Sequence, residues 1–299
     1  MNNQIIVGPI LGFEEGGFYT VCVLLEQGST PPVLEIRGLQ QTQPFTKAAK
    51  VAEKEFWRAE FQVPVPMLGL QVAYVVQVNG TALQDLHGRV GWSFYVPGSA
   101  EQPLIAYASC NGFSSAKLAR DTDKPYRLWE RMKDLHQTRP FSLLLMGGDQ
   151  VYADEIWESK KCPTLQRWNG LDAEEQEDAK VSARMASEIA GFYDGLYADR
   201  WKDETMSLMF ASVPSIMMWD DHDIFDGWGS YPERRHSCDV FQEVFRHASR
   251  VYDVFQLRCS SRNRLSPNGC HRTLRLVFRD FHILCLDNRS ERTMDQIMS

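Results

Sequence analysis

The chain has 299 residues, enough for one large domain or two ordinary ones, and 43% hydrophobic with 24% charged residues is a globular composition. The formal net charge of −7 disfavours a general nucleic-acid or membrane-surface binder, because such proteins use basic patches. An anionic substrate is not excluded, since a bound metal can reverse the field inside an acidic pocket.

Targeting and membrane signals are absent from the sequence as it stands. The N-terminal residues show neither the basic nor the apolar region of a secretory signal. No run approaches the roughly 18 apolar residues of a membrane span. Seven cysteines without a CxxC pair indicate neither a disulfide framework nor a zinc ribbon. We therefore expect a cytoplasmic protein with mostly reduced cysteines.

Residues 1–98 have the pattern of an all-β domain. Short runs rich in β-branched and aromatic residues alternate with Gly, Pro and Asn turns. We expect an antiparallel β-sandwich, ending at a Pro/Gly/Ser-rich break near Gly98. The predicted strands are "FYTVCVLLE", "PVLEIRG", "EFWRAEFQVPV", "LQVAYVVQVNG" and "VGWSFYVPG".

From Pro103 onward, strands alternate with helices, which predicts an α/β or α+β domain over residues 103–299. Helical periodicity predicts helices within residues 114–137, 173–199 and 233–257. A two-stranded hairpin is expected to turn near Asp280. The other predicted strands are the apolar runs "PLIAYA", "FSLLLMG" and "VPSIMMW".

Four of these strands run directly into a polar cluster. In open α/β sheets, ligands bind in the crevice beyond the carboxyl ends of the strands. If the strands are neighbours, the clusters meet at one edge and form one site. The clusters are Ser109-Cys110-Asn111, Gly147-Gly148-Asp149, Asp220-Asp221-His222-Asp223 and Asp287-Asn288-Arg289.

The carboxylates in these clusters indicate a cation site. Adjacent ionised carboxylates, as in "WDDHD", raise each other's pKa unless a cation neutralises them. The histidine of this run, His222, could be a ligand, a general acid or an orienting group. The alternative is a solvated acidic turn. In "GGDQVYAD", Asp149 could bridge two cations, or could simply be an N-cap or Asx-turn residue.

Three further residues have two or more interpretations. Cys110 could be a buried small residue without a chemical role, a thiolate ligand of iron or zinc, or a nucleophile. Tyr152 either packs in the core or supplies a phenolate to ferric iron. Arg289 either holds a phosphate by a bidentate contact or pairs with Asp287 or Glu291.

The motifs "YASCNGF", "GGDQVYAD", "WDDHDIFDG" and "LDNRSER", in this order, resemble the PhoD-like alkaline phosphatases of the calcineurin-like metallophosphoesterase superfamily. The resemblance implies a four-layer α/β metallophosphatase domain over residues 103–299, preceded by the sandwich. It implies a phosphoesterase that hydrolyses phosphomonoesters or phosphodiesters through a metal-activated hydroxide. Its substrate would be a small phosphoester, with neither a nucleic-acid surface nor a membrane contact expected.

The resemblance also implies a role for each motif residue. Cys110 corresponds to a thiolate metal ligand, Asp149 to the bridge between two metals, and Tyr152 to a phenolate ligand of iron. Asp221 corresponds to a ligand of the second metal. His222 would stabilise or protonate the leaving oxygen. The implied metals are iron and calcium, although related enzymes use other divalent pairs.

Arg289 is a candidate for a phosphate contact by the same resemblance. Two features depart from the family pattern. Asp223 and Asp226 stand where the family often has Glu and Asn. A late Gly-Asp-x-His segment with further ligands does not follow Arg292, so we expect a sequence truncated at its C-terminus. The alternative function is a catalytically impaired binding module with the metallophosphatase fold, lacking the late histidine ligands.

Overall fold

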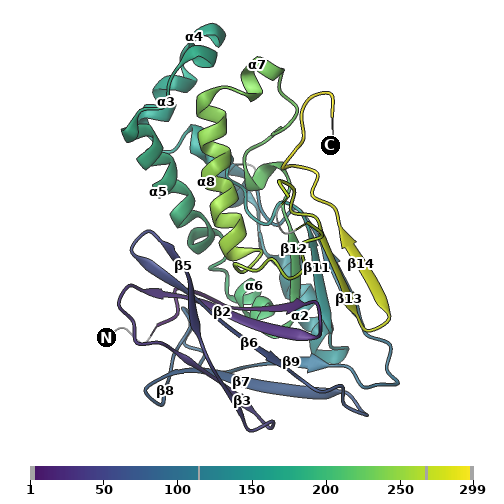
Figure 1. Cartoon of the computed structure of the whole chain (residues 1–299). Helices are drawn as coiled ribbons and strands as arrows, with labels where there is room; N and C mark the ends of the chain where they lie inside the picture. Colours follow the sequence, from purple (N-terminus) through teal and green to yellow (C-terminus); the bar gives the residue numbers. More distant parts are fainter. Residues whose placement is uncertain (1–3, 114, 267–268, 297–299) are drawn as a thin grey trace.

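The computed structural model describes residues 4–113, 115–266 and 269–296. Its centre is a seven-stranded sheet with the order β10-β11-β12-β1-β2-β6-β5 (Figure 1). Strands β10, β11 and β12 pair in parallel, as the apolar runs predicted. The seven strands are β10 (Ile105–Ala108), β11 (Leu143–Gly147), β12 (Ser215–Met218), β1 (Val7–Glu14), β2 (Phe18–Glu26), β6 (Lys54–Gln62) and β5 (Thr46–Val51).

The N-terminal segment contributes to two sheets. Four of its strands extend the seven-stranded sheet, where β1 pairs in parallel with β12 at Gly12 and Ser215. Strands from before and after residues 98–103 therefore pair in one sheet. The division of the chain into two domains at these residues stays a prediction. The second sheet contains β4 (Gln41–Pro44), β3 (Val33–Arg37), β7 (Leu70–Val78), β8 (Thr81–Ala82) and β9 (Trp92–Val96).

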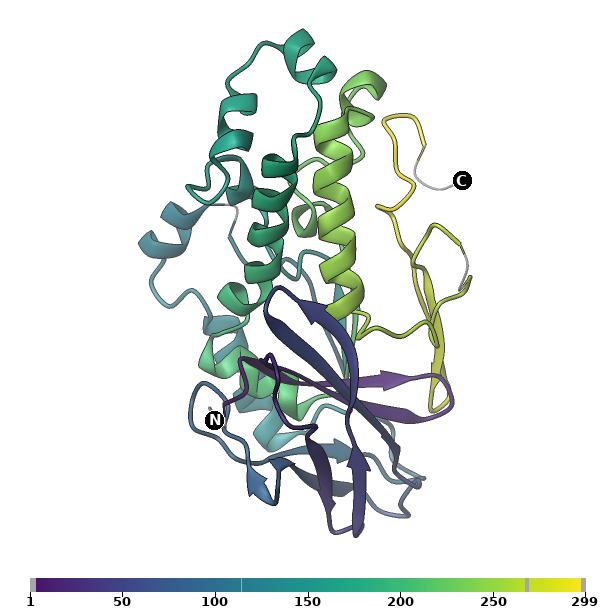
Figure 2. The same cartoon turned by 60° about the vertical axis from the view of Figure 1, so that its left-hand side comes forward.

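Aromatic side chains pack both faces of the large sheet. On one face, Phe56 of β6 meets Phe255 of helix α8 (Asp239–Phe255) at a centroid distance of 5.4 Å. On the other, Tyr19 of β2 meets Phe94 of β9 at 4.9 Å. Figure 2 shows the long helices α5 (Ala183–Arg200) and α8 on the side away from the second sheet. The middle strands β12, β1 and β2 are thus covered on both faces, which explains why almost all their residues are apolar and buried.

The helices are shorter than predicted. Each of the three predicted helical ranges contains two helices with a break between them; Ser114 lies outside the described residues. Between α4 and α5, the Ser182 hydroxyl accepts from the Met185 amide at 3.1 Å and begins a new helix. The helices are α1 (Ala116–Asp121), α2 (Arg127–Thr138), α3 (Pro163–Asn169), α4 (Ala173–Asp178), α5 (Ala183–Arg200), α6 (Glu204–Ser212), α7 (Glu233–His236) and α8 (Asp239–Phe255).

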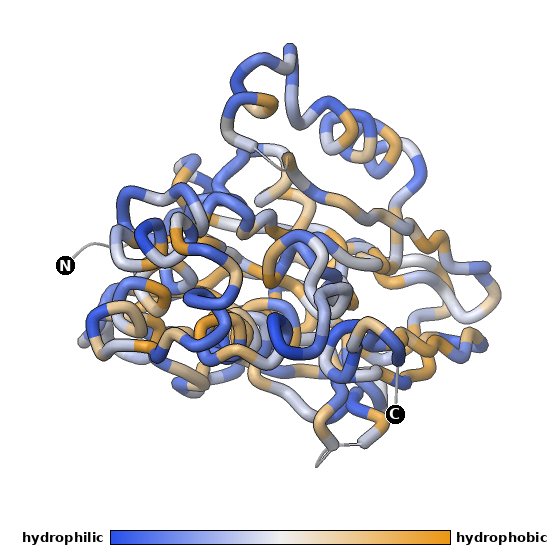
Figure 3. The backbone as a smooth tube through the Cα atoms, turned by 90° about the horizontal axis from the view of Figure 1, so that it is seen from above, coloured by the Kyte–Doolittle hydropathy of each residue, from blue (hydrophilic) through white to orange (hydrophobic). Residues whose placement is uncertain are grey.

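The predicted hairpin is present as β13 (Leu274–Phe278) and β14 (Phe281–Cys285). It packs on the core through Phe278, whose ring lies 4.8 Å from that of Phe13. Seen from above, hydrophilic residues predominate along the outer turns and hydrophobic stretches run through the interior (Figure 3). Of the helices in the described part of the chain, none combines the length and apolar character that crossing a bilayer requires.

Candidate metal centre

Two loops are joined at the carboxyl ends of β10 and β11. The Cys110 amide donates to the Gly148 carbonyl at 3.0 Å, and the Asn111 amide donates to the Asp149 carbonyl at 2.7 Å. Cys110 and Asp149 have φ of 57° and 54°, in the left-handed region that residues with side chains seldom occupy. Such strain is concentrated at functional sites. The first two predicted clusters therefore meet, as expected.

Gly148 brings the third loop close. Its φ is +126°, and a Cβ placed there would lie 2.8 Å from the Cβ of Asp220. Only glycine avoids both the strained conformation and this clash. The loop after β11 can therefore approach the loop after β12, and Asp149 faces the acidic run that begins at Asp220.

Asp149 contacts a thiol on one side. The Cys110 thiol donates to Oδ2 of Asp149 at 3.5 Å. Asp149 and Tyr152 are buried. Burial, followed by the nearby Asp149 carboxylate, raises the pKa of both the thiol and the phenol, so both hold their protons at neutral pH. A cation binding here would displace those protons.

On its other side, Asp149 faces two more carboxylates. One oxygen from each of Asp149, Asp220 and Asp221 lies within 4.8 Å of the others. Burial and then the charge of Asp220 raise the pKa of Asp149. A second group, with the same spacing, joins Asp221 to His222 and Asp226. Like charges this close are stabilised by a multivalent cation.

Arg289 supplies part of the missing positive charge. Its Nε donates to Oδ1 of Asp220, its Nη2 donates to Oδ1 of Asp221 at 3.2 Å, and its Nη1 donates to the Trp228 carbonyl at 2.7 Å. Asp287, one of the two partners considered for Arg289, accepts from the Arg289 backbone amide at 3.0 Å. The predicted phosphate contact of Arg289 stays a prediction.

His222 is held by a carboxylate that the sequence interpretation did not name as a site residue. Its Nδ1 lies 2.9 Å from Oδ2 of Asp154, and its ring stacks on Tyr152 at a centroid distance of 4.4 Å. Its Nε2 lies 4.0 Å from Oδ1 of Asp226. The hydrogen bond to Asp154 raises the pKa of His222 to about 9, against the opposing effect of burial. The signal for Asp154 was its place at the end of "GGDQVYAD".

Asp223, one of the two acids that depart from the family pattern, has a structural position between two loops. The residue is 2% exposed, and its carboxylate accepts from the Asp220 amide at 2.9 Å and from Gln256 Nε2 at 2.7 Å. It also accepts from the amides of Gln150 and Val151 at 3.1 and 3.2 Å. Burial raises the pKa of Asp223, and these donors oppose that rise. Asp223 therefore braces the loop after β12 against the loop after β11.

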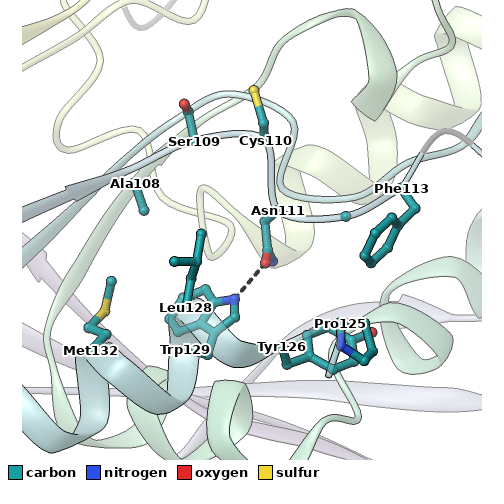
Figure 4. Close-up of a pocket in the computed structure, with 11 residues that line it drawn as sticks. Ala108, Ser109, Cys110, Asn111, Phe113, Pro125, Tyr126, Leu128, Trp129 and Met132 are labelled. Atoms are coloured by element: carbon teal, nitrogen blue, oxygen red, sulfur yellow. Dashed lines mark hydrogen bonds between the residues drawn. The ribbon is translucent and has the colours of Figure 1, made fainter. Parts of the chain in front are cut away.

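A cavity of about 250 Å³ lies beside the Cys110 loop, next to helix α2. Its lining is mainly apolar and includes Trp129, whose Nε1 donates to Oδ1 of Asn111 at 2.7 Å. Figure 4 shows the side chains of Ser109 and Cys110 on the far side of the loop from Trp129. Trp129 thus supports the loop on the cavity side through Asn111, while the Cys110 thiol faces Asp149.

The donors fit the two cations that the resemblance implies. A thiolate from Cys110 and a phenolate from Tyr152 suit iron. The oxygens of Asp220 and Asp221 suit calcium. Asp149 contacts both sets, so one carboxylate could reach two cations. The sequence interpretation missed Asp220 as a possible ligand, although the run "WDDHD" contained the signal for both acids.

The structure thus brings together the six residues predicted from the sequence. Each contacts another of the six directly or through a shared neighbour, and together they come from the four segments that follow β10, β11, β12 and β14. The six are Cys110, Asp149, Tyr152, Asp221, His222 and Arg289.

Sequence comparison places this site in a known family. Residues 76–299 match the family model described as PhoD related phosphatase. The chain is 30% identical over 225 residues to the uncharacterised protein YGR266W of Saccharomyces cerevisiae. That alignment covers 70% of this chain and 30% of the yeast protein, so the chain spans about a third of that relative's length.

One solved structure has a similar fold. A structure described as PhoD matches with a TM-score of 0.58 at 14% identity, covering 96% of this chain and 52% of that chain. A purple acid phosphatase from yellow lupin (Lupinus luteus) matches with a TM-score of 0.41 at 13% identity over 80% of this chain and 39% of the other, too distant to support an argument. The fold is mixed α/β and metallophosphatase-like. By its match over residues 76–299, the chain belongs to the PhoD-related phosphatase family.

Proposed function

We propose that the chain carries the metal centre of a metal-dependent phosphoesterase that hydrolyses small phosphomonoesters or phosphodiesters. The observation that supports this most is the convergence of Asp149, Asp220 and Asp221 beside Cys110 and Tyr152, at the carboxyl ends of parallel strands. Family membership supports the same conclusion.

Two cations would occupy the two sides of Asp149. Iron would take the Cys110 and Tyr152 side, and calcium or another divalent ion would take the Asp220 and Asp221 side. When bound, they would make hydroxide available near neutral pH and offset the charge that develops on the phosphoryl oxygens.

His222 would act on the leaving oxygen. Its Nδ1 is engaged by Asp154, which leaves Nε2 as the atom that would donate a proton. Because the hydrogen bond that His222 Nδ1 donates to Asp154 raises the pKa of His222 to about 9, the imidazole holds this proton at neutral pH. The stacked Tyr152 ring limits rotation of the imidazole. Asp154 is therefore a positioning residue for His222.

The architecture of the whole protein is part of the proposal. A four-layer catalytic domain from residue 103, preceded by a sandwich over residues 1–98, is supported by the likeness to PhoD, of which this chain covers 52%. A cytoplasmic location and a small phosphoester as the partner remain predictions.

The test compares Asp149→Ala with wild type. Metal content is measured by elemental analysis, and turnover is measured with p-nitrophenyl phosphate and bis-p-nitrophenyl phosphate. We expect two metals in wild type and a loss of metal and of at least about 100-fold in turnover in the variant. Asp134→Ala removes an exposed carboxylate from helix α2 and serves as the control.

Three outcomes would contradict the proposal. Wild type without metal and without turnover would favour the impaired binding module. Turnover that survives chelation but is lost on alkylation would favour a nucleophilic Cys110. Equal turnover in Asp149→Ala and wild type would show that Asp149 is not part of the active site.

A further inference from the structure

We propose that Arg289 is a built-in cation of the site, which positions Asp220 and Asp221 and competes with a metal ion for them. It would thereby set the affinity of the carboxylate side of the centre. This inference rests on the proposed function, because it concerns the cation that Asp220 and Asp221 would bind.

The guanidinium has no freedom to leave the site without breaking three bonds. Its Nε, Nη2 and Nη1 donate to Asp220, to Asp221 and to the Trp228 carbonyl. The side chain is 12% exposed, so little solvent screens these bonds. A planar fork with fixed donors suits two acceptors that must be held at a set spacing.

The backbone of Arg289 is fixed as well. Asp287, which is 1% exposed, accepts from the Arg289 amide at 3.0 Å and from Trp219 Nε1 at 2.8 Å. The Trp228 indole donates back to the Arg289 carbonyl at 3.1 Å. Arg289 is therefore held from both ends, and its charge is a permanent feature of the site.

The carboxylates are already engaged in this arrangement. Oδ1 of Asp221 accepts from Arg289, and its Oδ2 accepts from the Gly227 amide at 2.9 Å. A metal ion bound by Asp221 would have to share or displace these donors. It would also lie next to a positive guanidinium, and two cations sharing the same carboxylates repel each other. Both effects weaken metal binding on this side.

The experiment measures Mn²⁺ binding by titration calorimetry with Mn²⁺ as the sole added ligand, so no turnover is needed. Arg289→Met removes the charge and keeps a side chain of similar length. We expect Arg289→Met to bind Mn²⁺ at least about tenfold more tightly than wild type. Arg289→Lys, which keeps the charge, should stay within about threefold of wild type.

Two further variants complete the design. Arg275→Met removes the same charge from an exposed position on β13 and should leave Mn²⁺ affinity unchanged. If Arg289→Met does not fold, Arg289→Gln takes its place, because it removes the charge and keeps a hydrogen-bond donor. It should also bind Mn²⁺ at least about tenfold more tightly than wild type.

Each outcome decides. Tighter binding confined to the neutral Arg289 variants supports the inference. Equal or weaker binding in them, or equal tightening in Arg289→Lys, overturns it and leaves the proposed metal centre standing. If neither the wild-type protein nor any variant binds Mn²⁺, the proposed metal centre is refuted, and this inference with it.

Discussion

Removing the Asp223 carboxylate tests whether this residue braces two loops. Its oxygens accept from Asp220 N, Gln256 Nε2, Gln150 N and Val151 N at 2.9, 2.7, 3.1 and 3.2 Å. Each buried donor left unpaired costs roughly 1–3 kcal/mol before the loops relax or water enters. We expect Asp223→Ala to lower the free energy of unfolding by about 3–5 kcal/mol, below the sum over four separate donors because the loops relax and water reaches some of them.

The assay is urea unfolding of the metal-free protein, followed by tryptophan fluorescence. Asp223→Asn keeps the shape and one carbonyl acceptor, so its loss should be smaller, about 1–2 kcal/mol. Asp226→Ala is the matched control three residues away: its side chain is 79% exposed, and its effect should stay within about 0.5 kcal/mol. A loss below about 1 kcal/mol in Asp223→Ala would refute the bracing role.

Two further variants test the geometry around the site. Asp154→Asn removes the carboxylate that raises the pKa of His222 to about 9, so in the metal-free protein the imidazole should lose its proton nearer pH 6.5, as measured by NMR titration; an unchanged midpoint would contradict the pairing. Gly148→Ala adds a Cβ 2.8 Å from that of Asp220 at φ +126°, and should cost about 1–3 kcal/mol in thermal or urea unfolding. Gly191→Ala, with open space around the new methyl on α5, should instead stabilise by about 0.5–1 kcal/mol, and equal effects of the two would argue against the clash.

Most strands could be predicted because their signal is local, although β1 and β5 were not among the predicted runs. An apolar run such as "FSLLLMG" indicates a buried strand whatever its neighbours are, and the polar residues that follow it are read directly from the chain. The meeting of the first three clusters at one edge then followed from the parallel pairing of β10, β11 and β12. The fourth cluster follows β14, which pairs with β13 in a separate two-stranded sheet, so its arrival at the site could not be predicted in this way.

The helix breaks could not be predicted from periodicity alone. Within residues 173–199, α4 ends at Asp178 with Ala179 as its C-cap, and Ser182 caps a new helix that begins at Ala183. A serine competes with the backbone for hydrogen bonds in many contexts, so its choice between a helix interior and a cap depends on the packing around it.

The sequence by itself determined which chemical groups are available: thiol, phenol, imidazole, carboxylates and a guanidinium, at the ends of predicted strands. Only the tertiary structure decided which of the neighbouring acids does what. The short 3₁₀ turn at Asp221–Asp223 sends Asp221 toward Arg289 and buries Asp223 against the next loop. The direction of a side chain depends on the local backbone path and on partners distant in sequence, and neither is written in the spacing of residues.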